Sequence, residues 1–61
     1  MNPEYALLIL KEEKQKLEDK ITEMNLLEAE GEKINKRERT KYMHQLGSLE
    51  FTIEVLEEYL D

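Results

Sequence analysis

The apolar residues in the second half of the chain have a regular spacing. They are separated alternately by four and three positions: Tyr42, Leu46, Leu49, Ile53, Leu56 and Leu60. This heptad spacing places all of them on one face of a helix, along which a second helix can pack. The pattern predicts a helix over about 36–60.

A looser form of the same pattern occupies the first half of the chain. Its apolar members are Leu7, Leu10, Leu17, Ile21 and Met24. Lys14 and Glu28 stand at two places where the repeat would put apolar residues. We expect a helix over about 3–30, with a less regular seam than that of the second helix.

Local signals mark the ends of both helices. Asn2 is a favourable N-cap, and Pro3 suits the first helical position, where its missing N–H group is not needed. Gly31 can adopt the left-handed conformation that closes a helix. Asn35 can cap the second helix, and Glu38, three residues later, can bond back to it in a capping box.

The linker over 31–35 is short, so the two helices must run antiparallel. The predicted fold class is therefore all-α. We expect a single domain over 1–61, an antiparallel, coiled-coil-like two-helix hairpin.

The small size of the chain predicts that it associates with itself. A domain of 61 residues buries only about 60% of the surface that its unfolded chain exposes. Such domains are usually stabilised by disulfides, a metal or a second subunit. The chain has no cysteine and one histidine, so we expect a homodimer that forms a four-helix bundle.

The second helix has more apolar residues than one seam can cover. Successive helical residues are about 100° apart, which puts several apolar residues on a stripe well away from the seam. Others lie off the seam near the start of the first helix, and the antiparallel fold brings them to the same end. Exposed apolar patches mark interaction sites, so we expect an interface for a second copy or for a foreign protein. The predicted interface residues are Tyr5, Leu8, Ile9, Gly47, Phe51, Val55 and Tyr59.

Gly47 has two interpretations. A glycine inside a helix costs about 1 kcal/mol relative to alanine. It either allows another backbone to approach closely or is a weak residue that the helix tolerates.

Charged residues are arranged in blocks, and the formal net charge is −6. Folding at Gly31 predicts that opposite charges face each other along the hairpin, with the lysines of 11–20 directed toward the glutamates of 50–58. The second helix has bases at its start and acids at its end, which is unfavourable for its own dipole. It therefore needs an oppositely charged neighbour.

The residues do not form a combination suited to catalysis. His44 and Ser48 are one helical turn apart, but a single helix face offers neither an enclosed pocket nor a third group to orient them. Position 41, three before His44, is lysine, so the Glu-x-x-His pair of helical di-metal sites is missing. We expect no enzyme activity, no metal and no cofactor.

Five bases surround one acid between residues 33 and 41. This basic tip consists of Lys33, Lys36, Arg37, Arg39 and Lys41. It supports nucleic-acid binding as an alternative function, although a polyanion would have to pass acidic helices on a chain of net charge −6. Salt bridges to the acidic end of the first helix are the preferred explanation.

We therefore expect a non-enzymatic protein–protein interaction module. Its role would be that of a small accessory or inhibitor protein, of the kind that phages and other mobile elements encode, which docks on a larger host or defence protein and blocks it. The alternative is a dimeric structural or assembly scaffold. The longest apolar run, 5–10, is far short of the roughly 20 residues of a membrane span, and no positive leader precedes it. A cytoplasmic location follows as an expectation.

Overall fold

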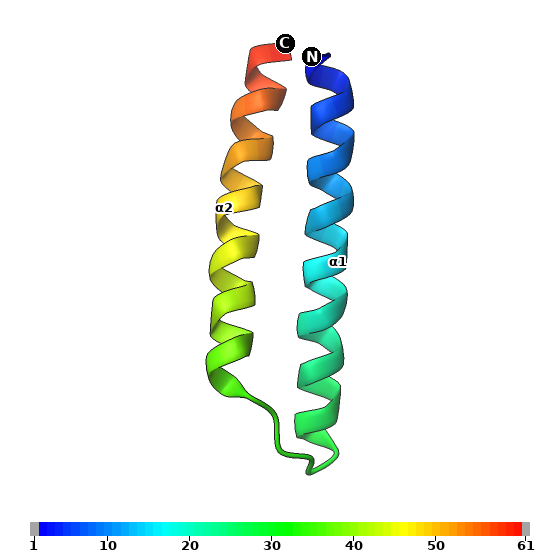
Figure 1. Ribbon diagram of the computed structural model, residues 1–61, viewed down its shortest axis with the longest axis vertical. Coiled ribbons are helices and arrows are strands. Elements are labelled where there is room, and N and C mark those ends of the chain that lie inside the picture. The colour runs from blue at the N-terminus through cyan, green and yellow to red at the C-terminus, as the bar shows by residue number, and fades with distance from the viewer. Residues whose placement is uncertain (1, 61) are drawn as a thin grey trace.

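The computed structural model describes residues 2–60 and contains two helices that pack side by side (Figure 1). Helix α1 spans Pro3–Ala29 and helix α2 spans Lys36–Leu60. The helices are antiparallel, so the start of α1 and the end of α2 meet at one end, which we call the open end. The all-α hairpin expected from the heptad spacing is confirmed, as a rod of 45 × 17 × 15 Å.

Both helices begin at the asparagine caps that the sequence predicts. The Asn2 side chain accepts a hydrogen bond from the backbone N–H of Glu4 at 2.9 Å, and that of Asn35 accepts one from Glu38 at 3.0 Å. The Glu38 carboxylate does not complete the predicted capping box. It accepts a hydrogen bond from the Tyr42 hydroxyl at 2.6 Å instead, which ties the first turn of α2 to its second.

Helix α1 ends at Ala29 and is closed by Gly31. This glycine has φ +89°, a left-handed conformation that residues with a side chain rarely adopt. Its N–H donates to the carbonyl of Glu28 at 3.0 Å, and the N–H of Glu32 donates to the carbonyl of Leu27 at 3.0 Å. These two bonds form a Schellman motif, which satisfies carbonyls that the helix end would leave unpaired.

The two seams form a narrow contact between the helices. Of the residues that the structure describes, only Ile53 is buried, with 6% of its surface exposed. The other seam residues are half-buried, including Lys14 and Glu28 of α1, except for the exposed Leu60 at the open end. Two helices alone therefore produce a line of contact and almost no enclosed core.

Candidate protein-binding surface

The apolar side chains predicted to form an interface are exposed at the open end. The first turns of α1 carry three of them and the last turns of α2 carry the other three, and these segments lie side by side (Figure 1). Tyr59 and Phe51 are the most exposed, at 76% and 69%. The full set of exposed predicted side chains is Tyr5, Leu8, Ile9, Phe51, Val55 and Tyr59.

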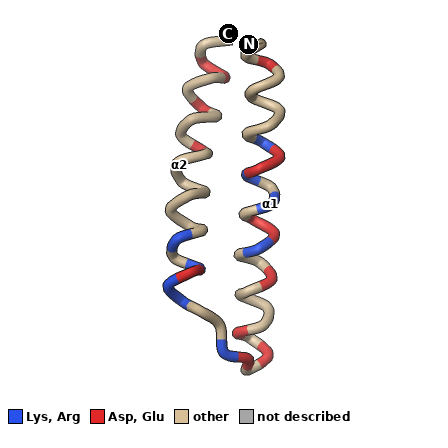
Figure 2. Tube along the Cα trace, viewed as in Figure 1, with Lys and Arg blue, Asp and Glu red and all other residues tan. Residues whose placement is uncertain are grey.

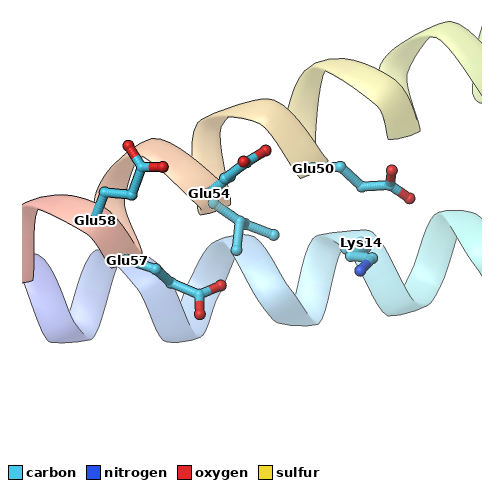
Figure 3. A pocket seen from close by; sticks show the side chains of 6 residues that line it. Lys14, Glu50, Glu54, Glu57 and Glu58 are labelled. Atoms are coloured by element: carbon cyan, nitrogen blue, oxygen red, sulfur yellow. The ribbon is translucent and has the colours of Figure 1, made fainter. Parts of the chain in front are cut away.

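The two flanks of the hairpin, where α1 and α2 meet along their length, differ in charge. On one, which we call the acidic flank, the side chains around Ile53 are Glu50, Glu54, Glu57 and Glu58 of α2 with Lys14 of α1 (Figure 3). On the other, which we call the neutral flank, the side chains that α2 contributes beyond Tyr42, toward the open end, are uncharged. An open hollow there is lined by Glu13, Leu17, His44, Gln45, Ser48 and Leu49.

Three of the predicted interface residues share the neutral flank. Val55 follows Ser48 by seven residues, which is two helical turns, and Tyr59 follows Val55 by four. On α1, Ile9 lies one turn before Glu13. The hollow on the neutral flank therefore continues toward the open end as an apolar strip made by Ile9, Val55 and Tyr59.

The other three predicted residues point elsewhere. Leu8 lies two turns before Gln15, which lines a hollow on the acidic flank. Tyr5 and Phe51 each stand two residues before a seam residue, which turns them to the outer faces of α1 and α2, away from the partner helix. The six side chains share one end of the rod but are distributed around it, and they do not form a single patch.

No other part of the described chain lies against Gly47. A Cβ atom built on it would meet no heavy atom within 4 Å. Packing between α1 and α2 therefore does not require a glycine at this position. If the residue serves close backbone approach, the approaching backbone belongs to another chain.

One residue of the basic tip is held within the hairpin. The Arg39 guanidinium bonds to the Glu28 carboxylate at 2.7 Å and to the Asn25 side-chain oxygen at 3.0 Å. This hydrogen bond from Arg39, together with the nearby charges of Arg39 and Lys36, lowers the pKa of Glu28 below its ordinary value of 4.5. Arg39 thus joins the two helices near the turn.

The sequence predicts salt bridges from the basic tip to the acidic end of the first helix, and the Arg39–Glu28 pair confirms this prediction for Arg39. Extending the α2 heptad three residues back from Tyr42 would have placed Arg39 on the seam. Glu28 occupies a seam position on α1, and antiparallel pairing brings the two together. The remaining bases of the tip, Lys33, Lys36, Arg37 and Lys41, are exposed.

The predicted facing of opposite charges is present in part. Lys11 and Lys14 of α1 line hollows together with glutamates of α2. Within residues 2–60, only the contact between Arg39 and Glu28 closes into an ion pair between the helices. Lys14 lies 3.8 Å from Glu18 of its own helix, although it borders the acidic flank. Exposed ion pairs gain little over hydration, so facing blocks of charge need not close into contacts.

Two other lysines of α1 are engaged within their own helix or with a ring. Lys16 pairs with Glu13 at 3.6 Å within α1. The Lys20 ammonium lies 5.1 Å from the centre of the Tyr42 ring, within the range of a cation–π interaction. The glutamates at the end of α2 are therefore left without ion-pair partners among the described residues of the hairpin.

Hydroxyl groups and carboxylates provide little chemistry in this arrangement. The Thr52 hydroxyl donates to the carbonyl of Ser48 at 2.9 Å, and the Thr40 hydroxyl donates to that of Lys36 at 3.0 Å. Across the described part of the chain, no three His, Asp or Glu side chains come together to hold a metal ion. Neither helix, as far as the structure describes it, has the length and apolar character to cross a bilayer.

The exposed apolar side chains of the open end and the free face at Gly47 are thus the features with most capacity for binding. Comparison with protein-family models, with curated proteins and with solved structures finds no match to this chain.

Proposed function

We propose that the chain is a non-enzymatic protein-binding module. It forms a homodimer with a four-helix core and docks the apolar side chains of its open end on a larger protein. The observation that carries the proposal is the exposure of large apolar side chains at that end, with Tyr59 foremost. Aromatic side chains are common anchors of protein interfaces because they bury a large area with few rotatable bonds.

The surface area supports association with another chain. The hairpin exposes 5016 Å². A compact monomer of 7.3 kDa exposes about 4,200 Å² by the usual scaling with mass. The excess of roughly 800 Å² is comparable with the area that one partner buries in a standard protein–protein interface. The hairpin exposes this excess area because it encloses almost no core, and a second polypeptide would cover it.

The neutral flank favours a protein partner at the open end. Val55 and Tyr59 continue an uncharged surface of α2, and Ile9 of α1 lies beside it, so a complementary apolar surface can cover these three side chains without desolvating a charge of α2. A nucleic acid is favoured less. Arg39 of the basic tip is already bonded to Glu28 and Asn25, and the net charge of −6 repels a polyanion.

A module of this kind acts by covering a surface. It requires no nucleophile, metal or cofactor, and a small acidic chain can block a larger protein simply by occupying its binding site. The proposed role is therefore that of an accessory or inhibitor subunit in the cytoplasm. A purely structural dimer is the second candidate, which the unpartnered Gly47 favours.

Capture on a solid support tests docking at the open end. The chain lacks cysteine, so Lys33→Cys at the far end allows attachment with the open end free. We expect a cytoplasmic lysate of the source cell to yield one protein in stoichiometric amount. Val55→Glu should abolish this capture, whereas Leu26→Glu, which charges an exposed apolar residue near the turn, should preserve it.

Two results would reject docking at the open end: absence of any stoichiometric partner, or equal capture by both glutamate variants. Light scattering over a wide dilution range tests the homodimer separately. A monomeric mass at every concentration would reject the dimer and leave the docking proposal standing.

A further inference from the structure

A second face of α2, distinct from the seam, is centred on Gly47. The buried Ile53 lies six positions after Gly47, so Gly47 is about 120° around the helix from the seam. We call the surface around it the Gly47 face. Its members lie three, four, seven, ten and eleven residues before and after Gly47, which are the spacings of neighbours on one side of a helix. The residues of this face are Lys36, Arg37, Thr40, Met43, His44, Gly47, Glu50, Phe51, Glu54, Glu57 and Glu58.

The charges of this face have opposite signs on the two sides of Gly47. Lys36 lies eleven residues before Gly47, and Glu58 lies eleven residues after it. Arg37 lies ten residues before, and Glu57 ten after. Figure 2 shows this division along α2, with blue near the turn, red toward the open end and an uncharged stretch between them.

The large apolar side chains of the face have the same symmetry. Met43 and Phe51 lie four residues before and after Gly47, and both are exposed, at 55% and 69%. Between them, a Cβ atom at Gly47 would meet nothing within 4 Å. The face therefore has a notch at its centre, with a large apolar side chain on each side of it.

We propose that α2 packs antiparallel against α2 of a second copy, with the two helices crossing at Gly47. In a two-fold arrangement, a residue at a given distance before the crossing point lies beside the residue at the same distance after it on the other chain. Met43 of each chain then contacts Phe51 of the other. Lys36 and Arg37 then approach Glu58 and Glu57 of the other chain, at both ends of the contact.

This pairing gives the glutamates at the end of α2 the ion-pair partners that they lack within their own described chain. The glutamates of the acidic flank have no ion-pair partner among the described residues of their own chain, and in Figure 3 the side chains of Glu54 and Glu58 extend away from α1. An antiparallel α2 brings bases to the negative C-terminal end of its neighbour and acids to the positive N-terminal end, which is the favourable arrangement for both dipoles. Glycine at the crossing lets the two backbones approach closely.

The inference rests on the proposed homodimer and specifies its contact. A pair of charge-reversal variants tests it: Lys36→Glu with Arg37→Glu in one chain, and Glu57→Lys with Glu58→Lys in another. Each variant alone places like charges together at both ends of the contact. We expect each to dimerise at least about tenfold more weakly than the unmodified chain, since four exposed ion pairs become repulsive.

An equimolar mixture of the two variants should restore the dimer. All four end contacts are then between opposite charges, because one chain carries only acids at these positions and the other only bases. The measurement is mass by light scattering or sedimentation for each variant and for the mixture. Circular dichroism of each variant verifies that the hairpin is still helical.

Three outcomes would overturn the inference. If both variants dimerise as the unmodified chain does, the copies associate through another face and the homodimer itself stands. If the mixture stays monomeric although its components are folded, the charges at the two ends of the Gly47 face do not pair between copies as the inference requires. If the unmodified chain is monomeric throughout, the homodimer fails together with this contact, and docking at the open end is unaffected.

Discussion

Gly47→Ala should stabilise the isolated hairpin. A helix-interior glycine costs about 1 kcal/mol relative to alanine, because its backbone loses more freedom on folding. The added methyl group meets no heavy atom within 4 Å, so no steric cost offsets this gain. With an unfolding entropy of about 2.1 cal/mol/K per residue, a gain of 1 kcal/mol in a chain of this length raises Tm by roughly 8 °C.

The other glycine of the chain is the matched control. A Cβ atom at Gly31 would also meet nothing within 4 Å, but its φ of +89° is strained for any residue with a side chain. Gly31→Ala should therefore destabilise the hairpin by about 1–2 kcal/mol and lower Tm. The same substitution, with free space for the methyl group at both sites, should thus raise Tm at Gly47 and lower it at Gly31.

Thermal unfolding followed by circular dichroism at 222 nm measures both effects, in samples dilute enough to be monomeric. A fall or no change in Tm for Gly47→Ala would refute the assignment of Gly47 to open space within the hairpin. In concentrated samples the same methyl group should weaken self-association, because it separates the two α2 helices at the proposed crossing. The stability gain should therefore shrink as the dimer becomes populated.

Two further predictions concern the seam and the ion pair. Ile53→Asp should unfold the hairpin, whereas Phe51→Asp, two residues away on the outer face, should keep its helicity and reduce dimer formation; equal helicity for both variants would contradict the packing. Glu28→Gln should destabilise the chain at neutral pH, and the difference from the unmodified protein should disappear as pH falls below 4.5. The folded pKa of Glu28 lies below that value, so the stabilisation from Arg39 is present above it and is lost as the carboxylate is protonated. A pH-independent difference in chemical denaturation would show that the charge of Glu28 is not what matters.

The fold could be predicted because its determinants are local. Asn2 and Asn35 accept hydrogen bonds from backbone groups two or three residues away, and Gly31 closes α1 through its own backbone conformation. The heptad spacing of α2 needs only one long neighbour to pack against. A short linker, residues 30–35, then leaves the antiparallel arrangement as the one solution.

The candidate surface could be predicted only in part. The exposure of Phe51 and Tyr59 follows from their angular positions around α2, which lie well away from the seam. The separation of Leu8 from Ile9 does not, because adjacent residues pass to different flanks only once the position of α2 around α1 is known. The lysines of α1 that face glutamates of α2 do not close into ion pairs for a related reason, since facing blocks of exposed charge have no fixed geometry in water.

The amino-acid sequence by itself determined where each helix begins and ends, which residues form the seams, and that α2 carries apolar side chains beyond its seam. These properties depend on interactions within a few residues or on the periodicity of one helix. Tertiary structure decided that Glu28 meets Arg39, that Gly47 faces open space, and that one flank of the hairpin is acidic and the other neutral. Each of these depends on the register and rotation of one helix against the other, which arise only when the two seams pack.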